Sequence, residues 1–249
     1  TLLLERGKSM PNQREYWDVP FEPVATGSEA DLCEELFARM REAVDIRLVS
    51  EVPLGAFLSG GVDSSAVVAA MAQLQSDPVN TCAIGFDVPQ FNETDFARQV
   101  ANRYGTNHLE RVVASDDFDL LDTLAALYDE PYADSSAIPT YRVCQLARER
   151  VTVALSGDGG DEHFAGYRRY RWHMNEERMR NLLPLGIRKP VFGTLGRLYP
   201  KLDWAPRVFR AKTTFESIGR TAVEAYLHSV SLTSDTQRNL MFSDAMQRE

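Results

Sequence analysis

The feature that most constrains the fold is a glycine-rich turn that joins an apolar strand to an apolar helix. Val52–Leu58 predicts a short buried strand, and Ala66–Ala72 continues as a helix. Between them lies Ser59-Gly60-Gly61-Val62-Asp63-Ser64-Ser65. Two adjacent glycines let backbone amides approach an anion, and the start of the following helix presents unpaired N–H groups to it. The turn therefore predicts a phosphate-binding site at the end of a strand.

Asp63 is the one residue of this turn that would repel a phosphate, which makes sense if its carboxylate holds Mg²⁺. The alternative is that serine, glycine and aspartate only cap the helix, as such residues often do. Two glycines and three hydroxyl groups are more than a cap requires. The turn is not a Walker A loop, because it has no lysine, and it lacks the third glycine of the dinucleotide-binding G-x-G-x-x-G pattern.

The composition narrows the classes of function. With 249 residues the chain can bury one large core or two unequal ones. Its formal net charge of −9 argues against a broad nucleic-acid surface, so we expect no nucleic-acid partner. The Arg-rich stretch 168–180 could form a local basic patch, but Glu176 and Glu177 dilute it and favour the solvated face of a helix.

Cysteine usage and hydropathy predict a cytoplasmic protein. Cys33, Cys82 and Cys144 are widely spaced and lie in expected helices or strands, so we expect buried thiols in a reducing compartment. No stretch approaches the roughly 20 apolar residues that span a membrane, and Leu2–Leu4 is too short for the core of a signal peptide. We therefore expect no membrane partner.

Strands and helices alternate along the first two thirds of the chain. The predicted elements are a helix over Glu29–Leu48, a strand over Val79–Phe86, a helix over Glu93–Tyr104 ended by Gly105, a strand over His108–Val113, helices over Asp116–Tyr128 and Ile138–Arg148, and a strand over Val151–Leu155. The last run is typical of a strand buried on both faces. This alternation predicts an α/β protein with a parallel twisted sheet, helices on both faces, and ligands at the carboxyl ends of the strands. Beyond Arg180, prolines punctuate short helical segments and predict a helical lobe.

A second turn, Ser156-Gly157-Asp158-Gly159-Gly160-Asp161-Glu162, follows the strand that ends at Leu155. It repeats the first turn's pattern of serine and glycine followed by carboxylates. Because parallel strands end at one edge of a sheet, the two turns should face each other there. They would then bring Asp63, Asp158 and Asp161 near a common Mg²⁺-polyphosphate ligand. The alternative is an ordinary turn, since aspartate and glycine dominate turns.

These two turns resemble motifs of a known family. Ser59–Ser65 is similar to the SGGxDSS pyrophosphate-binding motif of the N-type ATP pyrophosphatases, and residues 156–167 resemble the segment SGEGSDE-x-F-x-GY of asparagine synthetases. The resemblance extends from Arg14 to Tyr170. It implies the PP-loop fold of adenine nucleotide alpha hydrolases. It also implies a reaction in which a carboxylate, aspartate by default, attacks the α-phosphate of ATP, releases pyrophosphate and is then amidated by ammonia.

The resemblance implies a role for each matching residue. The β- and γ-phosphates of ATP would contact Ser59, Gly60, Gly61, Ser64 and Ser65. The adenosine would contact Leu58, Ile84, Ser156 and Gly157, partly through main-chain hydrogen bonds. Mg²⁺ would be held by Asp63 and Asp161, and the catalytic residues would be Asp158 and Asp161. Asp158 stands where the family has glutamate, so its carboxylate reaches one methylene less far.

The same resemblance implies a domain organisation. Residues 1–28 would be a linker from an N-terminal domain outside this chain, residues 29–182 the ATP-binding synthetase domain, and residues 183–249 a truncated helical lobe. Glutamine-dependent members carry an N-terminal glutaminase domain that supplies ammonia, and Cys33 cannot be its nucleophile because it lies inside a predicted helix. The family's catalytic lysine could be Lys201, Lys212 or a residue beyond Glu249. The sequence leaves open whether the protein forms a homodimer.

Two other functions are compatible with the paired turns. One is a PP-loop enzyme that adenylates a nucleobase in RNA, which the acidic charge disfavours. The other is a nucleotide-binding scaffold that has lost catalysis, which Asp158 and the unassigned lysine would explain. The acceptor is open as well, because enzymes of related families amidate sugars or cyclise β-lactam precursors.

Overall fold

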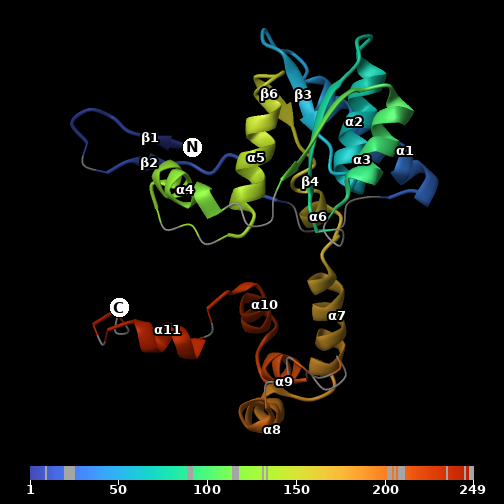
Figure 1. Cartoon of the computed structure of the whole chain (residues 1–249). Coiled ribbons are helices and arrows are strands. Elements are labelled where there is room, and N and C mark those ends of the chain that lie inside the picture. The colour runs from blue at the N-terminus through green and yellow to red at the C-terminus, as the bar shows by residue number, and fades with distance from the viewer. Residues whose placement is uncertain are drawn as a thin grey trace. The chain divides into compact units, whose positions relative to one another are not determined.

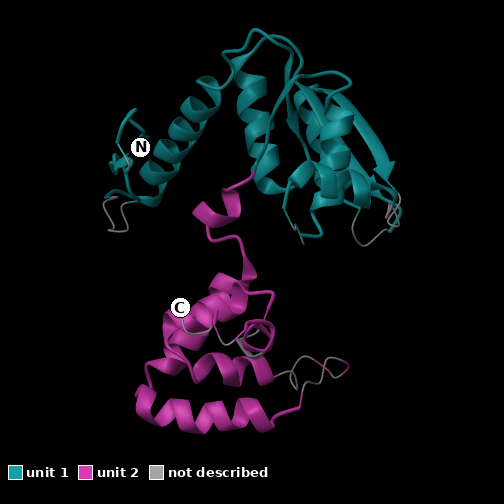
Figure 2. Ribbon diagram, turned by 90° about the vertical axis from the view of Figure 1, so that its left-hand side faces the viewer, with its two compact units in different colours: residues 1–157 teal, residues 158–249 magenta. Residues whose placement is uncertain are grey.

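The structure is a computed structural model that describes residues 1–8, 10–19, 26–88, 92–113, 118–130, 132, 134–200, 204, 206, 211–233, 235–243 and 245–246. The chain divides into two units, Thr1–Gly157 and Asp158–Glu249, coloured teal and magenta in Figure 2. This division falls earlier than the boundary expected at residue 182. The reason is that helix α7 (Arg168–Arg180) packs on helices that follow it in the chain.

A parallel four-stranded sheet forms the centre of unit 1, in the order β5-β4-β3-β6 (Figure 1). The strands are β3 (Leu54–Phe57), β4 (Asn80–Phe86), β5 (Asn107–Val113) and β6 (Val153–Leu155). β3 lies inside the sheet, where Ala56 is opposite Thr81 of β4 on one side and Leu155 of β6 on the other. The parallel pairing confirms the predicted topology.

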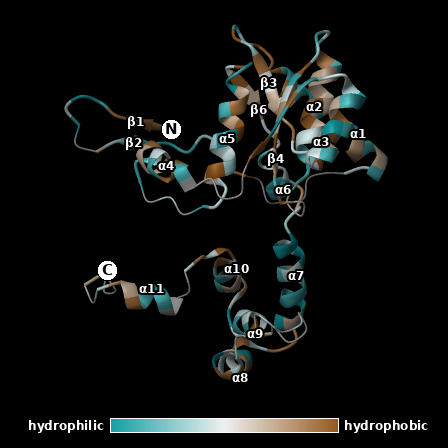
Figure 3. Ribbon diagram, viewed as in Figure 1, coloured by the Kyte–Doolittle hydropathy of each residue, from teal (hydrophilic) through white to brown (hydrophobic). Residues whose placement is uncertain are grey.

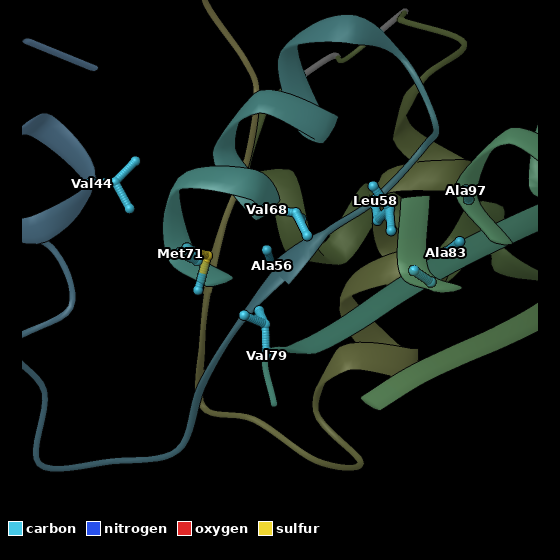
Figure 4. Close-up of a cluster of buried hydrophobic side chains, with 9 residues drawn as sticks. Val44, Ala56, Leu58, Val68, Met71, Val79, Ala83 and Ala97 are labelled. Carbon is cyan, nitrogen blue, oxygen red and sulfur yellow. The ribbon is translucent and has the colours of Figure 1, made fainter. Parts of the chain in front are cut away.

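Helices cover both faces of this sheet, as predicted (Figure 1). Helices α2 (Val62–Leu74) and α3 (Thr94–Tyr104) lie on one face, with α1 (Glu29–Asp45) beside α2, and α5 (Ala137–Ala147) lies on the other. Apolar side chains fill the first interface (Figure 4): Val44, Ala56, Leu58, Val68, Met71, Val79, Ala83, Ala97 and Ala101. On the second face, Cys82 of β4 packs against Leu146 and Ala147 of α5. Residues of the inner strands β3 and β4 thus pack against helices on both faces of the sheet.

Local sequence signals set the ends of several helices. Ser28 and Asp31 form a capping box at the start of α1, in which each side chain accepts a hydrogen bond from the other residue's backbone N–H. Gly105 ends α3 in the left-handed conformation, with φ of 61°, as predicted from its position after the last helical turn. These ends are therefore fixed by residues close in sequence.

Three features of unit 1 differ from the sequence prediction. β6 is an edge strand with Val153 42% exposed, so the prediction that it is buried on both faces was wrong. The predicted helix over Asp116–Tyr128 is a 3₁₀ turn, η2 (Phe118–Leu120), followed by α4 (Leu121–Tyr128), and residues 114–117 lie outside the described residues. The expected connector contains a short antiparallel pair, β1 (Leu2–Leu3) and β2 (Asn12–Gln13), and its residues 20–25 also lie outside the described part.

The regular secondary structure of unit 2 is helical throughout the described residues, as predicted for the lobe beyond Arg180. Its helices are α6 (Gly160–His163), α7, α8 (Leu185–Leu198), α9 (Lys212–Ile218), α10 (Ala222–Val230) and α11 (Asp235–Met241). α8 and α9 pack closely at Gly196, where a Cβ atom would lie 2.7 Å from Cγ of Glu216. Within the described ranges, no helix is both long enough and apolar enough to cross a membrane.

The Arg-rich helix α7 is hydrophilic along most of its length (Figure 3). The prediction of a solvated helix face was wrong at its C-terminal end, because Glu176 and Arg180 are only 7% and 2% exposed. The hydroxyl of Ser217 in α9 donates to the Glu176 carboxylate, and Arg180 Nη1 approaches Ser217 Oγ at 3.3 Å. Arg180 Nε donates to Glu177 at 2.7 Å. Buried charges are tolerated here because they are paired and hydrogen-bonded.

Candidate functional site

The predicted phosphate-binding turn lies at the carboxyl end of β3, one of the two inner strands of the described sheet. Gly60 has φ of 84°, a left-handed conformation that favours glycine, and α2 starts directly after Gly61. Within the described turn, no side chain forms a capping hydrogen bond at the N-cap, Gly61. The first amide groups of α2 therefore keep their capacity to bind an anion, and the helix dipole favours negative charge there.

Hydrogen bonds between the serines hold this turn in shape. Ser59 Oγ and Ser64 Oγ lie 3.0 Å apart, and the Gly61 N–H donates to Ser59 Oγ at 3.2 Å. Ser64 is 8% exposed, and its hydroxyl also approaches the Gly61 carbonyl at 3.2 Å. Ser65, in the first turn of α2, donates its backbone N–H to the same carbonyl. The turn is thus organised by its own polar groups before any ligand binds.

The second predicted turn meets the first at one residue. A Cβ atom on Gly157 would lie 2.5 Å from the backbone nitrogen of Ser64 and 2.8 Å from the carbonyl carbon of Asp63. Only glycine fits at that distance, because real Cβ atoms do not approach backbone atoms so closely. The structure therefore brings Ser156 and Gly157, after β6, to the first turn of α2. The start of the second turn therefore contacts the first turn at Gly157.

The three predicted carboxylates fall in different units. Asp63 belongs to unit 1, in the first turn of α2, and is partly exposed. Asp158 is the first residue of unit 2, and Asp161 lies in α6. Within unit 2 the backbone of Gly166 lies against the Asp161 carboxylate oxygen Oδ1, which leaves no room for a Cβ atom at that position. In the described part of the chain, no three acidic, His or Cys side chains cluster as a metal site.

Two residues expected at the adenosine have side chains directed into the protein core. Leu58 is 1% exposed and packs with Ala97 and Ala83 between the sheet and α3 (Figure 4), while its N–H donates to the Cys82 carbonyl at 2.9 Å. Ile84 is partly buried against the cluster that contains Cys82 and Leu146 on the α5 face. Any contact of Leu58 with a nucleotide therefore has to use its main chain.

Sequence reasoning missed the part that α3 plays at this edge. A Cβ atom on Gly60 would lie 2.6 Å from the backbone nitrogen of Ala97 and from Cβ of Phe96. A Cβ atom on Gly85, near the end of β4, would lie 2.7 Å from Cγ2 of Thr94. The adjacent glycines gave a signal for close approach of a ligand, but no local pattern indicates that a helix fills part of that space.

Several ionisable groups have shifted pKa values with clear causes. In unit 2, the Tyr167 hydroxyl donates to Glu162 at 2.7 Å, which lowers the pKa of the exposed Glu162 carboxyl and raises the pKa of Tyr167. In unit 1, burial raises the pKa of the Cys82 thiol to about 11, so this thiol stays protonated at neutral pH. Because its pKa is lowered, Glu162, which directly follows Asp161 in the chain, is charged at neutral pH.

Two further predictions concern the burial of the cysteines and the position of a catalytic lysine. All three cysteines are free thiols, but only Cys82 is buried, so the expectation of burial was wrong for Cys33 and Cys144. Of the two candidate lysines, Lys201 lies outside the described residues. Lys212, at the start of α9, donates to the Tyr199 carbonyl at 3.1 Å.

Comparison with known proteins identifies the family. The asparagine synthase family model matches residues 35–247. A Methanocaldococcus jannaschii protein provisionally named glutamine-hydrolysing asparagine synthetase 2 is 42% identical over 167 residues, 66% of this chain and 31% of that protein. Asparagine synthetase 1 of Bacillus subtilis is 35% identical over 175 residues, 70% of this chain and 27% of that protein. A Mycobacterium bovis protein provisionally named as such a synthetase is 33% identical over 205 residues, 82% of this chain and 30% of that protein.

The chain thus spans about a third of the length of the curated relatives it matches. The family match, by contrast, covers most of this chain, including both glycine-rich turns and the helices of unit 2. On this evidence the chain belongs to the asparagine synthase family.

Proposed function

We propose that this chain is the ATP-binding part of an amide-forming ligase that activates a carboxylate as an acyl-adenylate. The observation that supports this most directly is the contact of Gly157 with Ser64 and Asp63. It joins two glycine-rich turns at an uncapped helix N-terminus. Such a site suits a polyphosphate, because N–H groups and the helix dipole both favour anions.

In the proposed reaction, the substrate carboxylate attacks the α-phosphorus of ATP. The bond between the α-phosphorus and its bridging oxygen to the β-phosphate breaks, and pyrophosphate leaves with that electron pair. Ammonia then attacks the acyl carbon, AMP leaves, and the nitrogen gives up a proton to yield the amide. The amides at the start of α2 and the hydroxyls of Ser59 and Ser64 would hold the leaving pyrophosphate, which lowers the barrier to its departure.

We propose that Mg²⁺ binds as part of the nucleotide complex rather than at a preformed metal site, since no metal-binding cluster of acidic, His or Cys side chains exists among the described residues. Mg²⁺ in such sites is held by one or two carboxylates, with phosphates and waters completing its octahedron. Asp63, which is partly exposed beside the turn, would supply one carboxylate, and Asp161 is the second candidate. Bound Mg²⁺ would spread the negative charge that builds up on pyrophosphate.

We further propose aspartate as the acceptor and glutamine as the ultimate source of ammonia, delivered by a glutaminase domain. The names of the relatives, glutamine-hydrolysing asparagine synthetases, support this assignment. Asp158 would act near the acyl group, with a carboxylate one methylene shorter than the family's glutamate. The cytoplasm is the compartment that fits such an enzyme.

Calorimetric titration with ATP and Mg²⁺, combined with pyrophosphate exchange, tests the proposal. The chain should bind ATP, and exchange into ATP should require a carboxylic acid such as aspartate. Asp63→Ala should weaken ATP binding in Mg²⁺ by about ten-fold, the order expected for one lost charged ligand. The matched control is Asp122→Ala, which removes an aspartate from the first turn of α4 and should leave binding unchanged.

Absence of ATP binding would contradict the proposal. Binding without exchange for any acid would instead support the nucleotide-binding scaffold. ATP consumption stimulated only by RNA would support adenylation of a nucleobase.

A further inference from the structure

The first turn of α3 lies directly against the phosphate-binding turn. Atoms of Phe96 and Ala97 would lie only 2.6 Å from a Cβ atom on Gly60, so the two backbones are in contact. Thr94, at the start of α3, is 2% exposed, and its methyl group lies against Gly85 of β4. Its N–H donates to Asn92 Oδ1 at 3.2 Å. The first turn of α3 is thus wedged between the end of β4 and Gly60.

One side chain ties this helical turn to the neighbouring strand. Arg98 Nη2 and Nε donate to the two oxygens of Glu110 in β5 at 3.0 and 3.1 Å. Arg98 also donates to Thr94 Oγ1 at 3.3 Å and to Asp95 at 2.7 Å. A bidentate contact of this kind fixes direction as well as distance, because guanidinium and carboxylate are both planar. Arg98 therefore sets the position of the first turn of α3 relative to β5.

We propose that Arg98 is a positioning residue for ligand binding at Ser59–Ser65, acting through α3. The path of contacts runs from Glu110 through Arg98 and Thr94 to the backbone of Ala97, which bounds the space that Gly60 can occupy. This inference rests on the proposed function, because the ligand it concerns is ATP. If the ion pair is lost, the backbone of the first turn of α3 becomes more mobile. Gly60 then loses the packing contact that maintains its left-handed conformation.

The solvent exposure of the Arg98–Glu110 ion pair limits how much its removal can change the affinity for ATP. The Arg98 side chain is 52% exposed and that of Glu110 is 21% exposed. Ion pairs of this kind contribute little to stability, so we expect the affinity for ATP to fall by about two- to five-fold when the pair is removed.

The chain supplies a matched control on the same strand. Arg111 of β5 forms a bidentate pair with Glu149 at 2.8 and 3.2 Å. Its side chain is 49% exposed, close to the value for Arg98, and its partner follows α5 rather than belonging to α3. Arg111→Ala thus removes a similar surface ion pair without touching α3.

The experiment measures the Kd for ATP in Mg²⁺ and the hydrogen exchange of the amides of residues 60–65, in the whole chain. Arg98→Ala should weaken ATP binding by about two- to five-fold and speed exchange of these amides. Arg111→Ala should change neither. In Glu110→Gln the binding should weaken similarly, and Arg98→Ala combined with Glu110→Gln should bind no more weakly than either single variant.

Each other outcome decides against the inference. Equal effects of Arg98→Ala and Arg111→Ala on Kd and exchange would mean that Arg98 acts only on general stability. Unchanged Kd and exchange in Arg98→Ala, or fully additive losses in the double variant, would also overturn it. If the unmodified chain binds no ATP, the proposed function fails, and the exchange of residues 60–65 alone then decides whether Arg98 positions this turn.

Discussion

At the scale of single residues, glycines determine how closely the segments at the carboxyl edge of the sheet can approach. Gly60 and Gly157 each lie where a Cβ atom would be within 2.6 Å of another segment's backbone. Both positions could be selected from the sequence, because glycines next to serine and aspartate after a strand indicate close approach to a ligand. What the sequence did not indicate is that the close approach includes the protein's own backbone.

Gly157→Ala tests this packing. The new methyl would meet the backbone nitrogen of Ser64, which cannot rotate away, so the strand end or the start of α2 has to shift. We expect the free energy of unfolding to fall by about 1–3 kcal/mol, as for other overpacked sites. We also expect ATP affinity to fall by roughly ten-fold or more, because the shift displaces the amides of the turn.

Urea denaturation and calorimetric titration of this variant measure the two effects. Gly193→Ala is the control, since among the described residues outside its own stretch of α8 no atom lies within 4 Å of the position its Cβ would take. That variant should gain up to about 1 kcal/mol from helix propensity and bind ATP normally. A Gly157→Ala variant as stable and as active in binding as the original chain would show that the close contact is dispensable.

At the scale of elements, the same residue pattern has different consequences in different helices. Glu35 and Arg39 of α1 and Glu176 and Arg180 of α7 are both Glu–Arg pairs spaced by four residues. The first pair is exposed, while Arg180 and Glu176 are almost completely buried and bonded to α9 through Ser217. The spacing along the chain is the same in both pairs, and only packing decides which of them joins two helices.

Glu176→Ala should therefore be much more damaging than Glu35→Ala. It removes the acceptor for Trp172, Ser217 and Arg180 and leaves a buried guanidinium with one carboxylate fewer. We expect a loss of about 3 kcal/mol in the free energy of unfolding, against less than about 0.5 kcal/mol for the exposed pair. Thermal denaturation followed by circular dichroism compares the two variants. Similar losses for both would mean that the α7–α9 network contributes no more than a surface pair.

At the scale of the whole molecule, the shifted groups combine into one dependence of stability on pH. Burial is the main cause that lowers the pKa of His108, whose Nδ1 lies 2.9 Å from Thr81 Oγ1. The positive charges of Arg98 and Arg150 lower this pKa further, while the negative charge of Glu110 raises it. Its Nε2 is a buried atom without a hydrogen-bond partner among the described residues. Hydrogen bonds lower the pKa of carboxyls such as Asp134 and Glu149. All of these shifts make the folded chain bind fewer protons than the unfolded chain.

The free energy of unfolding should therefore fall as pH falls, in two windows. Above the ordinary histidine pKa of about 6.5, His108 is neutral in both the folded and the unfolded chain and does not change the free energy of unfolding. Below it, the unfolded chain takes up a proton that the folded chain resists, so stability declines until the lowered pKa is passed. The carboxyls add a second decline below about pH 4. The melting temperature at pH 5 should be lower than at pH 7.5, and His108→Asn should flatten this difference. An unchanged slope in that variant would assign the first window to other groups.

Elements close in sequence were largely predictable. The strand, the two-glycine turn and the helix around Ser59–Ser65 were expected, as was the end of α3 at Gly105. The alternation of strands and helices also predicted that the strands are parallel, although not their order in the sheet. These features follow from dihedral preferences, helix capping and apolar patterning, which act over a few residues. Membership of the asparagine synthase family was indicated by the resemblance of the two turns to motifs of that family, and the family match over residues 35–247 confirms it.

Tertiary structure decided what depends on segments distant in the chain. It placed β6 at an edge although its composition predicts a central strand, and it buried Leu58 and Arg180 while leaving Cys33 and Cys144 exposed. It also set the contacts of Gly157 with Ser64 and of α3 with Gly60. The type of a residue determines which contacts its side chain can make. Whether that side chain is buried depends on which other elements pack against it, and this is fixed only when the sheet, its helices and their glycine contacts are assembled.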